Sequence, residues 1–146
     1  MRYALTLLCS LMLVLNTVAD TVTDLRPAIN EAAAAYGVDP VMMEAIIRHE
    51  SAHATSHAAR NKNNLAGIMG RSGQRRYESK EECVQDLARI LADYKAKGRV
   101  TLTQISRTYC ASGGEWVSIV SHNMRAIRAG KWGEVPYAAA EEESKG

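Results

Sequence analysis

The stretch Ala45–Gly70 reads AIIRHESAHATSHAARNKNNLAGIMG, and it divides the chain into two kinds of structure. An apolar run with helical spacing ends at Glu50, and a small, polar, histidine-rich segment separates it from the compact string NNLAGIMG. The run starts upstream at Asp39, a favoured N-cap residue, with Pro40 in the first helical position. These signals predict a buried helix that ends on a carboxylate and is followed by a loop-rich segment.

Outside this stretch the chain shows the same helical pattern. Apolar residues recur at helical spacing in residues 23–37, 79–98, 101–110 and 113–130. Ser79 with Glu82 forms a capping-box pattern at the start of the clearest of these helices. No alternating strand of any length is found, and RSGQRRYES at residues 71–79 can form at most a small β-hairpin. The pattern predicts a mainly α fold with a loop-rich region between its second and third helices.

The two ends of the chain differ from the middle. The N-terminus carries Arg2, a short apolar core and the small residues TVA, which predict a signal peptide over residues 1–19. The apolar core is too short to span a bilayer comfortably, although an uncleaved membrane anchor remains the alternative. We therefore expect an exported, periplasmic or extracellular chain with no stable membrane span after cleavage. Its folded domain is expected over residues 20–130, and residues 131–146 are expected to form a flexible C-terminal tail.

Composition limits the classes of binding partner and indicates the state of the cysteines. The chain has 146 residues, which fits one domain, and its net charge of +2 is too balanced to indicate nucleic acid. Two cysteines, Cys83 and Cys110, remain after signal cleavage. An even pair in an exported chain predicts a disulfide between them, and two buried free thiols are the alternative.

The histidines raise the possibility of a metal site. His49, Glu50 and His53 spell H-E-x-x-H, the zinc-binding pattern that needs both imidazoles on one helical face. The residues between them hold a helix weakly, and no downstream ligand with its glycine follows, although His57 lies a further four residues on. We expect no metal or cofactor, and a zinc-dependent hydrolase that uses these residues remains an alternative.

A second interpretation treats Glu50 as the chemical group. A carboxyl that ends an apolar helix and faces a cleft is disfavoured as an anion by burial and by the helix dipole. A protonated carboxyl is what a general acid needs to protonate a leaving glycosidic oxygen. Gly67 would let a ligand approach the backbone, and Ile68 with Met69 would pack beneath a sugar. A solvated helix end beside a buried turn is the structural alternative.

Four blocks in order then resemble a known family. They are AIIRHESA at 45–52, NNLAGIMG at 63–70, RRYESKEECVQDLARIL at 75–91 and TYCASGGEWVSIVSHNM at 108–124. Together they are similar to the bacterial glucosaminidase-type peptidoglycan hydrolases of the lysozyme-like superfamily, over roughly residues 38–127. The pairing of ES with GIMG also resembles the lytic transglycosylases of the same fold.

The resemblance implies a lysozyme-like helical domain that cuts the β-1,4 bond between N-acetylglucosamine and N-acetylmuramic acid. It implies that Glu50 is the general acid and that peptidoglycan strands are the partner, with service to a secretion or conjugation apparatus as a further analogy. The residues that it assigns to substrate binding or to orienting the acid are Ser51, Asn64, Gly67, Ile68, Met69, Tyr77 and Tyr109.

The sequence also departs from the family pattern. Many relatives carry a β-rich lobe with a second carboxylate before the position of Tyr77, and here only RSGQRR at residues 71–76 fills that gap. The nucleophile would then be a water activated by another group, the substrate's N-acetyl group, or the muramyl hydroxyl. The products would carry reducing or anhydromuramyl ends accordingly, and a non-catalytic glycan-binding domain is the remaining alternative.

Overall fold

The computed structural model describes residues 20–110 and 113–137, so the predicted signal peptide and residues 138–146 of the predicted tail lie outside the described residues. The elements, in chain order, are α1 (Thr21–Asp24), α2 (Arg26–Tyr36), α3 (Pro40–Glu50), α4 (His57–Lys62), β1 (Met69–Gly70), β2 (Gly73–Gln74), α5 (Lys80–Ala96), α6 (Leu102–Tyr109) and α7 (Gly113–Arg128). The predicted mainly α fold is confirmed. Among the described residues, no helix is both long and apolar enough to cross a membrane.

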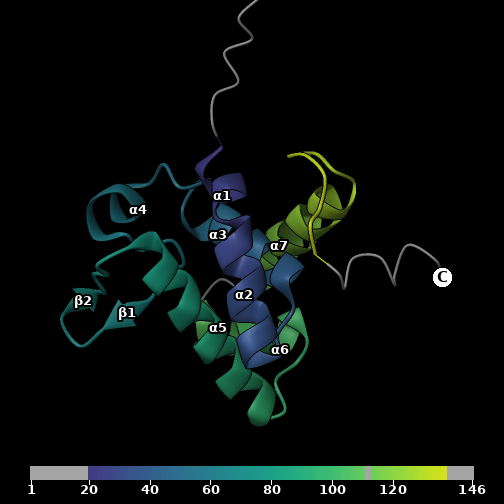
Figure 1. Ribbon diagram of the computed structural model, residues 1–146. Helices are drawn as coiled ribbons and strands as arrows, with labels where there is room; N and C mark the ends of the chain where they lie inside the picture. The colour runs from purple at the N-terminus through teal and green to yellow at the C-terminus, as the bar shows by residue number, and fades with distance from the viewer. Residues whose placement is uncertain (1–19, 111–112, 138–146) are drawn as a thin grey trace, which may run out of the picture.

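Helix α3 is the centre of the fold. It packs against α7 on one side and α2 on the other, while α2 also packs on α5 and α6 packs on α7. Most of its side chains are buried, including Met43, Ile46 and Ile47. A helix that is buried nearly all round is a core helix, and its burial fixes the position of its last residue, Glu50. The small hairpin and α4 project together from one side of this helical body (Figure 1).

The predicted helix starts are confirmed by their caps. The Asp39 carboxylate accepts a 2.8 Å bond from the Val41 N–H at the start of α3. At α5, Ser79 Oγ accepts from the Glu82 N–H at 3.1 Å. The Glu82 side chain reaches the Glu78 N–H rather than that of Ser79, so the predicted capping box is displaced by one residue. The small hairpin is also present, with its strands paired over residues 69–74 rather than later in the segment.

The chain leaves α3 through a left-handed turn that the sequence did not reveal. Ala52, His53 and Ala54 have φ angles of 47°, 56° and 67°, a region that costs L-residues roughly 1–2 kcal/mol each. Hydrogen bonds compensate, since the Ser56 and Thr55 N–H groups both donate to the Ser51 carbonyl at 2.9 and 3.0 Å. The turn reverses the chain directly after Glu50.

This turn rules out the geometry of the zinc alternative. Helix α3 ends at Glu50, so His49 and His53 do not share a helical face. His53 instead lies with Nδ1 3.2 Å from an Arg48 guanidinium nitrogen, and its ring packs at 5.5 Å against Trp132. The H-E-x-x-H match is therefore a coincidence of sequence, because its second histidine belongs to a different piece of structure.

The described part of the C-terminal segment, beyond the expected domain boundary at residue 130, packs on α3. Tyr137 is buried, and its hydroxyl donates a 2.8 Å bond to Glu44. The Arg48 guanidinium lies 4.0 Å from the centroid of the Trp132 ring. Apolar periodicity fades here because the segment is not a helix, and single aromatic side chains anchor it instead.

The predicted disulfide is also corrected. Within the described residues, no disulfide joins Cys83 to Cys110. Cys83 Sγ accepts a 3.3 Å bond from the Leu65 N–H, and burial raises the pKa of its thiol to about 11. The thiol therefore remains protonated at neutral pH and holds the NNLAGIMG loop against α5.

Candidate active site

Glu50 lies at the end of the core helix, between two parts of the chain that are distant in sequence. Its side chain is half-buried, and Oε1 accepts a 2.7 Å bond from the indole N–H of Trp116 on α7. Trp116 is itself almost fully buried, so its ring cannot swing away. One carboxylate oxygen is therefore fixed by a rigid donor, which orients the other.

Gly67 forms the other side of the carboxyl. Its φ of 65° is left-handed, and a Cβ built at this position would lie 2.8 Å from Glu50 Oε2. Any larger residue would be strained by its backbone and would also collide with the carboxyl. The predicted close approach at Gly67 is thus an approach of the loop backbone to the candidate catalytic acid itself.

Asn64 supports this loop from beneath. Its side chain is buried, and Nδ2 donates to the Ile68 and Arg75 carbonyls, each at 2.9 Å. Its Oδ1 accepts from the Ile68 N–H at 3.0 Å. Both polar atoms of the amide make bonds within the protein, so in this structure Asn64 supports the loop, and its predicted contact with substrate stays a prediction.

Ser51 and Tyr77 are supporting residues as well. Ser51 is fully buried, and its Oγ donates to the Ile47 carbonyl and accepts a 2.8 Å bond from the Ala54 N–H. Tyr77 is buried and donates to Asp86 at 2.6 Å. The bonds of Ser51 shape the turn after Glu50, and the bond of Tyr77 to Asp86 anchors the loop to α5.

Tyr109, at the end of α6, is the predicted tyrosine that does lie beside the acid. Its hydroxyl donates to the Ala66 carbonyl, and its ring lies 5.5 Å from that of Trp116. Burial, followed by the negative charge of Glu50, raises the pKa of Tyr109 well above its ordinary value. The phenol therefore stays neutral at physiological pH and keeps its bond to the Ala66 carbonyl, which holds the loop beside α6.

An open groove of about 350 Å³ borders this arrangement. The loop supplies Gly67, Ile68 and Met69, α5 supplies Ile90, Asp93 and Tyr94, and α6 supplies Thr108 and Tyr109. Glu50 is not itself one of the lining residues, but Gly67, which lines the groove, lies against the Glu50 carboxyl. Met69 is 64% exposed on the rim, where an apolar side chain can cover one face of a sugar ring. The structure thus brings together four of the predicted substrate-lining residues.

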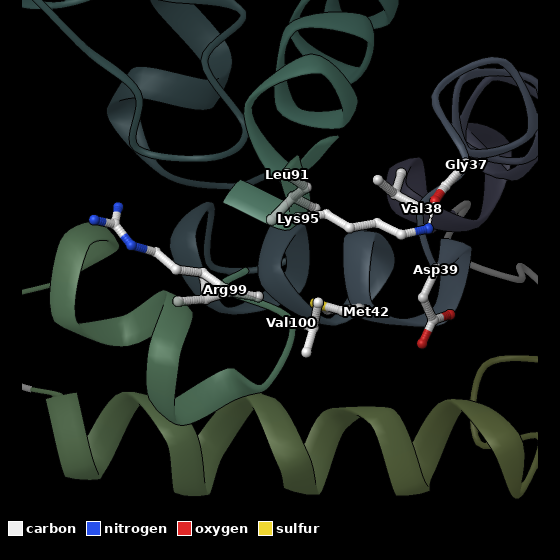
Figure 2. Close-up of a pocket in the computed structure, with 9 residues that line it drawn as sticks. Gly37, Val38, Asp39, Met42, Leu91, Lys95, Arg99 and Val100 are labelled. Atoms are coloured by element: carbon white, nitrogen blue, oxygen red, sulfur yellow. Dashed lines mark hydrogen bonds between the residues drawn. The ribbon is translucent and has the colours of Figure 1, made fainter. Parts of the chain in front are cut away.

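A second cavity lies away from this arrangement. It has a volume of about 190 Å³ and is formed where the α2–α3 junction meets the end of α5, with Val38, Met42 and Leu91 in its wall (Figure 2). Lys95 crosses it to donate a 2.8 Å bond to the Gly37 carbonyl. None of the predicted site residues lines this cavity. The one carboxylate among its described lining residues, Asp39, is already used to cap helix α3.

Sequence reasoning missed a buried charged cluster at the base of α3. The fully buried Glu44 accepts two 3.0 Å bonds from Arg26, a 2.9 Å bond from Arg48 and the bond from Tyr137. Arg48 also pairs with Asp20 at 2.8 Å. The spacing of Glu44 and Arg48 was a visible signal, but Arg26 and Tyr137 come from distant segments. Through Arg48, which lies two residues before Glu50, the cluster holds the end of α3 in place.

A helical body in which one carboxyl is fixed at the edge of an open groove is the arrangement of a glycosidase with a lysozyme-like fold. The chain belongs to the glucosaminidase family: the family model described as mannosyl-glycoprotein endo-beta-N-acetylglucosaminidase matches residues 26–135. This match confirms the resemblance found in the sequence. No curated protein matches the chain.

Proposed function

We propose that the protein is exported and cleaves the glycan strands of peptidoglycan, at the β-1,4 bond between N-acetylglucosamine and N-acetylmuramic acid, with Glu50 as general acid. Family membership supports a glycosidase that acts on the cell wall. The observation that carries the role of Glu50 is its position between the Trp116 indole and the Gly67 backbone, at the edge of the groove.

The two oxygens of Glu50 have different surroundings, which suggests how a proton would be delivered. Trp116 donates to Oε1, so a proton on the carboxyl belongs on Oε2. Oε2 lies beside Gly67, where any side chain would collide with it, so a glycine at this position keeps the oxygen uncovered. Proton transfer to that oxygen breaks its bond to the anomeric carbon and leaves positive charge on the sugar, as in other glycosidases.

Tyr109 and the rim residues would hold the reacting sugar. The Tyr109 O–H is used by the Ala66 carbonyl, so its oxygen can only accept a bond from a sugar hydroxyl, while Met69 and Ile68 offer an apolar surface for a sugar face or an acetamido methyl. Arginines near the hairpin add positive charge that suits the lactyl and peptide carboxylates of peptidoglycan. Arg75 and Arg89 are partly neutralised by Asp86, whereas Arg71 and Arg76 are exposed.

Substitution of Glu50 tests the proposal. Glu50→Gln keeps the size of the side chain and a carbonyl oxygen that accepts from Trp116, but it cannot supply the proton. We expect release of fragments from purified sacculi to fall by at least 100-fold, the range attributed to general acid catalysis, with an unchanged melting temperature. The matched control is Glu31→Gln, which changes an exposed glutamate on α2 and should leave activity unaltered.

The same assay also tests the three alternatives, a lytic transglycosylase, a zinc-dependent hydrolase and a non-catalytic glycan-binding domain. Mass spectrometry of the fragments from the unmodified protein should find reducing N-acetylglucosamine ends, whereas anhydromuramyl ends would indicate a lytic transglycosylase. Activity should persist in EDTA. Binding to sacculi without any release would identify a glycan-binding domain and would overturn the enzymatic proposal.

A further inference from the structure

The open question at this site is which group activates the nucleophile. The segment RSGQRR, where many relatives have a lobe with a second carboxylate, contains no acid. The groove nevertheless has one carboxylate in its wall, Asp93 on α5. Resting on the function proposed above, we propose that Asp93 is the general base that activates the attacking water and that the enzyme is an inverting hydrolase.

The neighbouring carboxylates are committed to structural tasks. Asp86, two turns earlier on α5, accepts from Tyr77 and pairs with Arg75 and Arg89 at 2.7 and 2.6 Å. Glu82 closes the N-terminus of α5 through the Glu78 N–H. Release of either carboxylate would cost the protein those bonds. The Asp93 side chain makes no comparable set of bonds, since its contact is with the exposed Lys97.

Asp93 is also accessible. Its side chain is 51% exposed, and its ion pair with Lys97 is a 2.6 Å contact between two exposed groups one helical turn apart. Exposed pairs of this type contribute little to stability, so the contact yields readily to a water or a sugar hydroxyl. Ile90 and Tyr94 on the same helix face line the groove with it, which directs this face of α5 toward bound substrate.

The two carboxylates border the same groove from different elements. Glu50 lies against Gly67, which lines the groove from the loop, whereas Asp93 lines it from α5. In an inverting glycosidase the two carboxyl groups leave room for a water between the base and the sugar. A carboxylate on α5 would thus supply the base that the lobe supplies in many relatives, and no additional segment of chain is needed.

The step balances as a single displacement. Asp93 takes a proton from water as the water oxygen bonds to the anomeric carbon. The bond from that carbon to the glycosidic oxygen breaks, and its electron pair stays on the leaving oxygen, which takes the proton of Glu50. Asp93 ends protonated and Glu50 ionised, and exchange with solvent restores both. The new reducing end has the α configuration, opposite to the β bond that was cut.

The first test needs only the unmodified protein. Proton NMR of a soluble, uncrosslinked glycan strand during cleavage should show the α-anomer of the new N-acetylglucosamine end before mutarotation. Initial appearance of the β-anomer, or of anhydromuramyl ends, would overturn the role of Asp93 while leaving a glycosidase in place. If the protein releases nothing at all, it is the proposed function that fails.

The second test uses variants. We expect Asp93→Asn to lower kcat by at least 100-fold with less than a threefold change in KM, and Glu81→Gln at the far end of α5 to change neither. Azide needs no base, so it should restore turnover of Asp93→Ala by more than tenfold and yield an α-glycosyl azide. A purely structural role would give no azide rescue, and unchanged kcat in Asp93→Asn would refute the proposal. The anomer measurement decides the matter even if a variant fails to fold.

Discussion

At the scale of single residues, the site depends on what lies against Glu50. Trp116 determines which carboxylate oxygen is occupied, and Gly67 determines how closely the loop approaches the other. In the proposed reaction neither residue would carry out chemistry, yet both would limit where Glu50 delivers its proton. Catalysis is sensitive to such placement, because errors of about 1 Å in a reacting group can cost about 100-fold in rate.

Gly67→Ala tests this dependence. The methyl would meet Glu50 Oε2 at 2.8 Å on a backbone with φ of 65°, so either the loop or the carboxyl must move. We expect the free energy of unfolding to fall by about 1–3 kcal/mol and activity to fall at least tenfold. Gly73→Ala is the control for backbone strain alone, because a Cβ there meets nothing within 4 Å although φ is 112°. It should lower stability but spare activity, and equal activities in both variants would contradict the argument.

His53 provides a pH prediction at the same scale. Burial, then the charge of Arg48, lowers the pKa of His53, with Lys131 acting in the same sense and Asp20 opposing. A lowered histidine pKa means that the unfolded chain binds more protons, so stability is lost as pH falls through the ordinary value near 6.5. Lowering the pH from 7.5 to 5 should therefore reduce the melting temperature of His53→Gln by less than it reduces that of the unmodified protein. An identical pH slope for the two proteins would show that His53 contributes nothing.

At the scale of elements, the left-handed turn after α3 ends the helix, a task that a glycine with positive φ usually performs. Three non-glycine residues with positive φ are strained, and they are held by the bonds to Ser51 on the preceding helix end. The turn carries the chain away from Glu50, which leaves the acid at an exposed helix end rather than in the middle of a longer helix. Helical propensity gave no sign of it, because alanine favours helix.

Ala52→Gly tests the strain in this turn. At a φ of 47°, glycine removes a steric penalty of roughly 1–2 kcal/mol and adds about 0.5–1 kcal/mol of chain entropy to the unfolded state. We expect an unchanged or slightly increased free energy of unfolding in urea. Ala35→Gly is the matched control, since this exposed alanine lies within helix α2, and it should lose about 1 kcal/mol. Equal losses in both variants would mean that the turn is not strained.

At the scale of the whole molecule, the two ends of the described chain meet at helix α3. Asp20 pairs with Arg48, and Tyr137 donates to Glu44, so segments more than a hundred residues apart are joined through one turn of α3. A buried charge cluster of this kind is costly to break, because a partner left behind is desolvated and unpaired. The position of Glu50 thus depends on both ends of the domain.

Tyr137→Phe tests the coupling between the ends. It removes one donor from the fully buried Glu44 carboxylate while keeping the ring. We expect a loss of about 1.5–3 kcal/mol in the free energy of unfolding, typical of a hydrogen bond to a charged group, with a corresponding fall in melting temperature. Tyr36→Phe, at an exposed tyrosine on α2, should be neutral. Equal stabilities of the two variants would show that the C-terminal segment does not support the fold.

The sequence by itself determined the longer helices, most of their caps, the fold class and the family, because helical periodicity and capping are local and the four motifs lie in order along the chain. It did not reveal the short helices α1 and α4, and α4 lies in the segment expected to be loop. It also indicated Glu50, Gly67, Ile68, Met69 and Tyr109, whose types match the chemistry of a sugar groove. It did not show that Asn64, Ser51 and Tyr77 are buried supports, since a polar side chain looks the same in sequence whether it binds a ligand or its own backbone. Only the tertiary structure decided that the Cys83 and Cys110 thiols are not joined, that Trp116 contacts Glu50 and that Asp93 lines the groove. Those facts depend on distances between segments that are remote in sequence, and such distances are set by the packing of the whole core.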